Sequence, residues 1–198
     1  MSPRGVAIPE VRQQLFDAAE RVLLREGPSG LSGRAITREA GVATGLLYNH
    51  FPDLDEFLAE LLLDRARKVT ASLSGLPGRA GTSTVVDNLM SAVETLFSGN
   101  VLALAGLALA RPAIVAGLGR AVGDGTLTMD AGERLFAAYL EAERTQGRIS
   151  EGADTASLAL ALVGAAHQLL LTRGPHAPDL RERMHQVTVT LIAGVSRP

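Results

Sequence analysis

Between residues 44 and 50, five small or polar residues have the chemistry to bind nucleic acid. They are Thr44, Gly45, Tyr48, Asn49 and His50. Hydroxyl, amide and imidazole groups hydrogen-bond to phosphate oxygens and base edges, and glycine lets a backbone approach closely. Leu47 and Phe51 stand four residues apart, so they form the apolar stripe of a short helix and leave the polar side chains outward. A helix of this width fits the major groove of duplex DNA.

A second short helix must precede this one to hold it in place. Ile36 and Ala40 stand one helical turn apart and share a face. Ser32 is a suitable N-cap for this helix. Gly41 adopts the left-handed conformation that ends a helix without a Cβ penalty, and Val42 fills the corner. Two short helices joined at Gly41 predict a helix-turn-helix.

The remaining periodicity predicts further helices and no strand. A first helix over residues 10–26 carries a buried stripe at Leu15, Ala18, Ala19, Val22 and Leu23, and glycine and proline at residues 27–30 end it. Residues 1–9 form a loose arm, in which Arg4 either reaches a minor groove or belongs to a frayed end. Beyond the helix-turn-helix, we expect helices over residues 53–74, 83–98, 101–121, 127–147, 154–173 and 178–194. The predicted fold is all-α, with a three-helix N-terminal domain (1–52) and a C-terminal helical bundle of about six helices (53–198).

The composition indicates a globular protein of modest charge. Of 198 residues, 46% are hydrophobic, the mean hydropathy is +0.18 and the net charge is −2. The chain has no cysteine and no apolar signal segment, which excludes disulfides and thiolate metal sites and fits the cytoplasm. Residues 1–52 contain six arginines and five acids. Strong DNA binding would therefore need a second copy of the domain.

The run Gly41-Val42-x-x-Gly45-x-Leu47-Tyr48-x-His50-Phe51, followed by an acidic helix start at residues 53–58, resembles the DNA-binding signature of TetR-type transcriptional repressors. The resemblance implies a site on double-stranded DNA that consists of Arg34, Thr37, Thr44, Gly45, Leu46, Tyr48, Asn49 and His50. Tyr48 would meet a phosphate or simply pack, and His50 would touch the DNA backbone, cap the helix end or pack. Thr44 and Asn49 would contact phosphates or base edges, Gly45 would permit close approach, and Arg34 and Thr37 would lie near phosphate.

Three positions depart from the family pattern. Ala43 stands where serine or threonine is usual, so capping of the second helix is left to Thr44 or to no residue. Leu46 replaces a residue that is often polar and either contacts a thymine methyl or loses a contact. Leu54 stands where a lysine usually meets the DNA backbone.

Two long uncharged runs, 95–110 and 155–172, are better explained as buried helices than as membrane spans. The resemblance implies a homodimer through the last two helices, bound to a palindromic operator without membrane contact. The expected interface comprises Leu158, Leu162, Ala165, Leu169, Val187 and Leu191.

The resemblance also implies a cavity for a small inducer that releases the protein from DNA. Candidate lining residues are Met90, Glu94, Phe97, Met129, Phe136, Tyr139, His167 and Gln168, and a largely apolar ligand would suit them. Ordinary core packing is the alternative for the methionines, the aromatic residues and the histidine.

An enzyme is not expected. The chain has no phosphate-binding glycine loop, no nucleophile elbow and no metal-ligand spacing, so we expect no catalytic residue, cofactor or metal. The alternative function is a helical interaction protein that retains the scaffold but has lost DNA recognition. If the protein binds DNA, the sequence does not distinguish a repressor from an activator.

Overall fold

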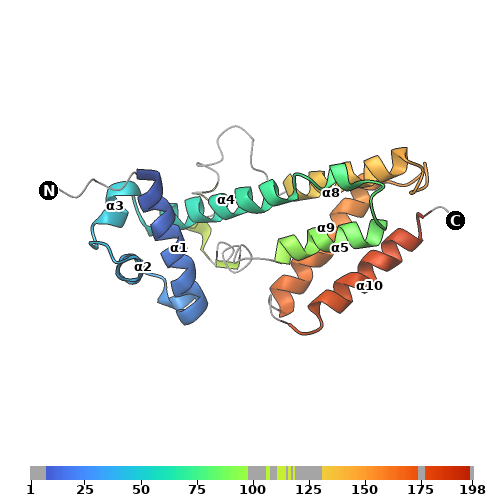
Figure 1. Cartoon of the computed structure of the whole chain (residues 1–198). Helices are drawn as coiled ribbons and strands as arrows, with labels where there is room; N and C mark the ends of the chain where they lie inside the picture. The colour runs from blue at the N-terminus through green and yellow to red at the C-terminus, as the bar shows by residue number, and fades with distance from the viewer. Residues whose placement is uncertain are drawn as a thin grey trace. The chain divides into compact units, whose positions relative to one another are not determined.

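The computed structural model describes residues 8–97, 106–107, 111–114, 116, 118, 131–173 and 177–196. Across these residues the secondary structure is helical, apart from turns and one isolated antiparallel bridge between Ile149 and Ser196 (Figure 1). The prediction of an all-α fold is confirmed.

The first helix, α1 (Ile8–Glu26), forms where the apolar stripe predicts it. All five residues of that stripe are buried. Gly27 then takes a φ of 72°, which favours glycine, and a short 3-10 turn, η1 (Pro28–Gly30), leads away.

Local signals set the bounds of the next helix, α2 (Gly33–Ala40). The Ser32 hydroxyl accepts a hydrogen bond from the Ala35 amide at 3.2 Å and so caps its start. Gly41 ends it in the left-handed conformation, with a φ of 69°. The next helix, α3 (Leu46–His50), has only five residues, and its N-cap is Gly45, which has no capping side chain. Capping of this helix therefore falls to no side chain, the second of the two predicted outcomes.

The fourth helix, α4 (Leu54–Leu73), is capped by Asp53, whose carboxylate accepts from the Glu56 amide at 2.8 Å. At its start lies an aromatic cluster, with Phe51 edge-on to Phe57 at 4.9 Å between ring centroids and Phe16 against both. This cluster packs α1 and the end of α3 against α4.

The chain divides into two compact units, and α4 runs through the division. The first comprises residues 1–63 and 103–123, and the second comprises residues 64–102 and 124–198. The sequence predicts a boundary after residue 52, ahead of α4 rather than within it. Of the segment 103–123, Leu107 and Ile114 are buried, and Arg111 pairs with Asp55 at 2.6 Å.

The second unit is a helical bundle. A 3-10 turn, η2 (Pro77–Arg79), precedes α5 (Val85–Phe97), α8 (Ala131–Thr145), α9 (Thr155–Arg173) and α10 (Leu180–Ala193). Helix α9 contacts α5, α8 and α10, and α10 also contacts α5 (Figure 1). The core is made mainly of aliphatic side chains together with the two aromatic residues Phe136 and Tyr139.

Helix α9 is long and apolar enough to meet a length-and-composition criterion for a membrane span, but only 28% of its most apolar stretch is buried. Its inward residues are Ala159, Leu162, Val163, Ala166 and Leu170. Leu160 and Leu171 on other sides are more than half exposed. The expected burial of this helix on all sides is therefore not seen among the residues that the structure describes.

Candidate nucleic-acid interface

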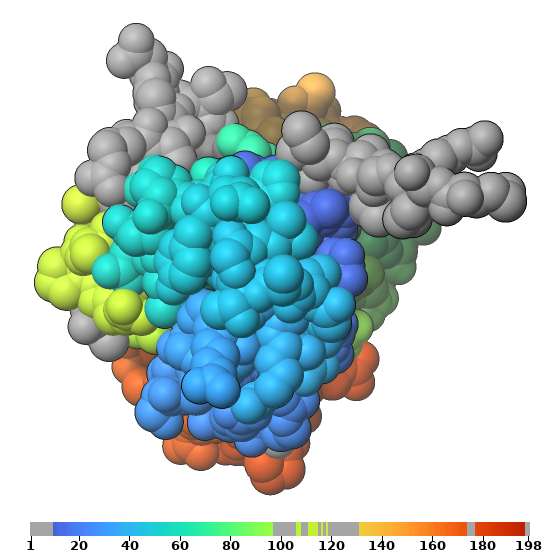
Figure 2. Space-filling model, turned by 90° about the vertical axis from the view of Figure 1, so that its left-hand side faces the viewer, coloured from blue at the N-terminus to red at the C-terminus, as the bar shows by residue number. Residues whose placement is uncertain are grey.

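Helix α3 and the residues just before it divide into a buried and an outward side, as the sequence predicts. Leu47 and Phe51 are at most 1% exposed. The outward side carries Thr44, Gly45, Tyr48 and Asn49, all exposed, with Leu46 and His50 half-buried. Figure 2 shows α2 and α3 together on one face of the first unit. A short helix therefore presents a hydroxyl-rich and amide-bearing surface to solvent.

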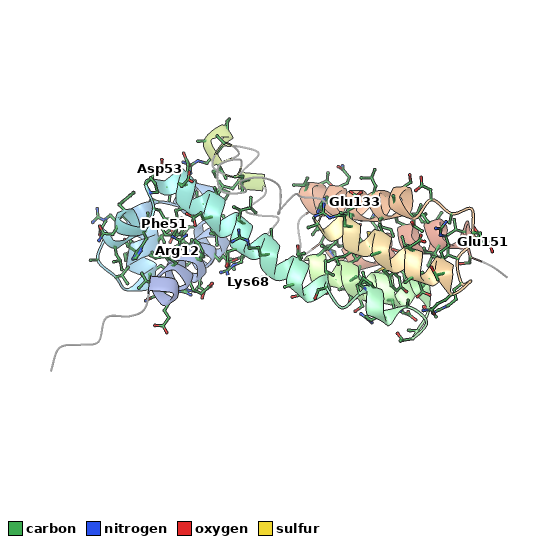
Figure 3. The ribbon with its side chains drawn as sticks, turned by 90° about the horizontal axis from the view of Figure 1, so that it is seen from above. Arg12, Phe51, Asp53, Lys68, Glu133 and Glu151 are labelled. Atoms are coloured by element: carbon green, nitrogen blue, oxygen red, sulfur yellow. The ribbon has the colours of Figure 1, made fainter. Side chains whose placement is uncertain are left out.

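Arg12 on α1 fixes the far end of this short helix. Its guanidinium lies 4.3 Å from the centre of the Phe51 ring, and Figure 3 shows the two side chains together. The same group donates a hydrogen bond to the His50 carbonyl oxygen at 3.4 Å and pairs with Glu60 on α4. A five-residue helix is marginal alone. This three-way contact compensates by attaching its last carbonyl to two longer helices.

Helix α2 is attached to α1 by polar contacts. Gln14 donates to the Ala40 carbonyl oxygen at 2.8 Å, at the end of α2. Glu39 accepts from Arg21 at 2.8 Å and pairs with Arg25 at 2.9 Å. Hydrogen bonds from Arg21 and then Arg25 lower the pKa of the Glu39 carboxyl. These two arginines are therefore engaged within the domain.

The positive charge left over on α2 comes from Arg34 and Arg38. Both are exposed, and their spacing of four residues places them on one face of the helix. Within the described part of the chain neither forms an ion pair or a side-chain hydrogen bond. Arg34 is among the residues predicted from the sequence, whereas Arg38 is not. The missing information was that Arg12, Arg21 and Arg25 are engaged by acids, which leaves these two available. Arg4 lies outside the described residues.

The predicted position of Thr37 near a phosphate is wrong. Its side chain is fully buried. Its hydroxyl donates to the Gly33 carbonyl oxygen one turn earlier, at 2.8 Å. Such a back-bond satisfies the hydroxyl inside the helix, so threonine can occupy a core position. We therefore leave Thr37 out of the candidate interface.

The residues expected around an inducer cavity do not meet at one cavity in the described part of the second unit. Phe136 and Tyr139 are fully buried in the core, and Met90 is nearly so. Burial, aided by a hydrogen bond to Glu143 at 2.5 Å, raises the pKa of the Tyr139 phenol well above its ordinary value. The Tyr139 hydroxyl therefore already has a hydrogen-bond partner inside the core.

The polar members of that set lie apart from these core residues. Glu94 is exposed and pairs with Arg181 at 2.5 Å, Gln168 is exposed, and His167 is half-buried, where burial lowers its pKa. The Phe97 side chain and Met129 lie outside the described residues. A groove of about 560 Å³ does lie between α5 and α10, but of the predicted residues it includes only Met90 and Glu94.

The expected dimer surface is partly wrong. Leu162 is fully buried within its own chain, so it has no surface left for a partner. Leu158, Ala165, Leu169, Val187 and Leu191 are half-buried and pack against the core. The large apolar side chains that remain exposed on these helices lie outside the predicted set and are Leu160, Leu171 and Val189. Among the described residues no group of three or more potential metal ligands comes together.

The helix-turn-helix segment of the chain is similar to that of known proteins. Residues 15–61 match the family model for bacterial regulatory proteins of the tetR family. The transcriptional regulator PksA of Bacillus subtilis is 34% identical over 77 residues, which cover 39% of this chain and 38% of PksA. The chain thus spans well under half the length of this curated relative.

Solved structures have a similar fold over nearly the whole length of this chain. A TetR-family structure from Mesorhizobium loti superposes with a TM-score of 0.76 and 18% identity, covering 98% of this chain and all of the other. FadR from Bacillus subtilis, solved with stearoyl-CoA, gives a TM-score of 0.69 and 19% identity, covering 92% and 98%. At these identities the likeness is one of fold. Residues 15–61 therefore carry the helix-turn-helix segment of the tetR family, and the chain as a whole has the fold of TetR-family structures.

Proposed function

We propose that this protein is a sequence-specific DNA-binding transcriptional regulator, a dimeric cytoplasmic repressor that a small, largely apolar ligand releases from its operator. The observation that carries the proposal is the shared face of α2 and α3. The exposed residues of these two helices and the turn between them include two unengaged arginines and several hydroxyl and amide groups. Arginines and hydroxyls on such a face position a protein on phosphates, and amides bind base edges.

Within this proposal, each outward residue has a chemical role. Arg34, Arg38 and the Tyr48 hydroxyl bind phosphate oxygens. Asn49 hydrogen-bonds to a base edge, for which an adenine is the geometrically suited partner. Thr44 makes no capping bond, so its hydroxyl is available to phosphate or base. Gly45 lets the backbone approach the groove, with Leu46 and His50 at the edge of the contact.

Dimerisation is the second part of the proposal, and α9 supports it. Leu160, Ala161, Gly164, Gln168 and Leu171 are exposed and recur at helical spacing along one side of α9. A Cβ added at Gly164 would meet nothing within 4 Å, so a second helix has room to approach closely there. An apolar helix face of this length favours cover by a second copy. Two recognition helices related by a two-fold axis would match a palindromic operator.

Release by a ligand is the third part. FadR has this fold and was solved with stearoyl-CoA, which supports a fold that can admit a ligand with a long apolar chain. Because Phe136 and Tyr139 are packed in the core, we do not place a ligand among the residues first expected. The ligand must bind the DNA-free state more tightly than the DNA-bound state, or it shifts nothing.

The test is fluorescence-anisotropy binding to the duplex upstream of the protein's own gene, against a scrambled duplex. We expect tighter binding to the upstream duplex, weakened by Tyr48→Phe and by Asn49→Ala. Circular dichroism of each variant controls for folding. Feeble, equal binding to both duplexes by a folded dimer would contradict recognition of that duplex and favour the helical interaction protein.

A further inference from the structure

Gly33, the first residue of α2, is buried although it begins a helix on the surface of the domain. The group that covers it is the ring of Tyr48. An added Cβ at position 33 would lie 2.5 Å from the Tyr48 hydroxyl oxygen, 3.0 Å from Cζ and 3.3 Å from Cε2. The outer edge of the tyrosine ring therefore rests directly on the glycine backbone.

The backbone itself does not require glycine at this position. Gly33 is not among the glycines of positive φ, which are Gly27, Gly41, Gly81 and Gly147. Glycine also disfavours a helix relative to alanine, because it has more conformational freedom to lose. The contact with Tyr48 is thus the feature of the structure that accounts for the missing side chain.

We infer that Gly33 is a positioning residue for the phosphate-binding tyrosine: its bare Cα sets the place of the Tyr48 hydroxyl against the start of α2. The inference rests on the proposed DNA-binding function. Carbon and oxygen at van der Waals contact lie about 3.5 Å apart, so any side chain at position 33 displaces the hydroxyl by roughly 1 Å. A displacement of that size misaligns a hydrogen bond to a fixed phosphate.

The place where the hydroxyl is held suits an anion. The Ser32 side chain already occupies the Ala35 amide, whereas the Gly33 and Arg34 amides begin the helix and have no acceptor within it. Within the described part of the chain, the Tyr48 hydroxyl also lacks a hydrogen-bond partner. The positive end of α2 lies beside it, and the next residue of that helix, Arg34, carries an unengaged charge. Gly33 therefore brings one more donor to a point where phosphate is already favoured.

The displacement should leave folding unharmed, which makes the inference testable. Tyr48 is 51% exposed, so its ring can swing outward into solvent when a Cβ appears. Gly33→Ala should keep or raise the thermal midpoint, because alanine favours a helix. Gly132→Ala is the matched control: it changes a glycine within α8, where an added Cβ meets nothing within 4 Å.

The position of the Tyr48 ring can be monitored by fluorine NMR in the absence of DNA. The chain has two tyrosines, so 3-fluorotyrosine labelling gives two fluorine resonances, which Tyr48→Phe assigns. We expect Gly33→Ala to shift the Tyr48 resonance alone and to weaken operator binding about tenfold or more, as for loss of a hydrogen bond to a charged group. In the Tyr48→Phe background, the same glycine change should have little further effect on binding.

Three outcomes would overturn the inference in distinguishable ways. If the wild-type protein distinguishes its operator but Gly33→Ala binds it equally well, the positioning role is wrong and the proposed function stands. An unmoved Tyr48 resonance would refute the contact itself. If the wild-type protein distinguishes no duplex, the proposed function fails and the inference fails with it.

Discussion

Arg34 and Arg38 should set the salt dependence of DNA binding. Each arginine that neutralises a phosphate releases counterions, and the logarithm of affinity falls by about 0.9 per phosphate for each tenfold rise in salt. Two unengaged arginines per chain make four in a dimer, which gives a slope of about −3.6. Affinity should therefore fall roughly 150-fold between 50 and 200 mM salt.

The informative variant is Arg38→Ala, because this residue was found from the structure alone. It removes two phosphate contacts per dimer, so the slope should relax to about −1.8. Arg21→Ala is the matched control. It also removes an arginine from the domain, but one that is engaged with Glu39, and the slope should stay unchanged.

The assay is anisotropy titration of the operator duplex at four or more salt concentrations, for the wild-type protein and both variants. An Arg38→Ala slope equal to that of the wild type would show that Arg38 does not meet phosphate. A wild-type slope implying more than about six phosphates would show that the charge count on this face is wrong.

The remaining predictions concern the contacts that hold the domain and the dimer together. Arg12→Ala should destabilise the N-terminal domain by about 1–3 kcal/mol, through loss of the ring contact and the ion pair, measured as faster amide exchange in α3 than in α9. Gly41→Ala should cost about 1–2 kcal/mol in denaturant unfolding, because alanine does not favour a φ of 69°. The double variant Leu160→Glu with Leu171→Glu should convert a dimer to a folded monomer in analytical ultracentrifugation. The control Leu24→Glu, at a similarly exposed leucine on α1, should leave the dimer intact. A dimer that persists in the double variant would refute the α9 interface.

The helix-turn-helix was predictable from sequence because its signals are local. Ser32 and Gly41 act within one turn of where they stand, and both behave as predicted. The burial of Thr37 was missed because its hydroxyl bonds to a carbonyl of its own helix, which a reading of polar residues as outward residues overlooks. Arg38 was missed for a different reason, since which arginines are engaged depends on contacts between helices.

The second unit was less predictable because its helices differ little in hydrophobicity from one side to the other. Helix α9 is apolar on most sides, so periodicity cannot distinguish Leu162, which points into the core, from Leu160, which is exposed. Choosing a dimer surface from that pattern was therefore unreliable. The same holds for the expected cavity, because Phe136 and Tyr139 have the same residue types whether they line a pocket or fill a core.

The most direct test of the central claim is selection of genomic fragments by the purified protein, followed by sequencing of the bound DNA. The account predicts that bound fragments share one motif with two-fold symmetry, and that Asn49→Ala binds them with reduced preference at specific base pairs. Selection from the whole genome also finds an operator that lies far from the protein's own gene. A folded dimer that enriches no motif over the input DNA would contradict sequence-specific recognition by the α2–α3 face.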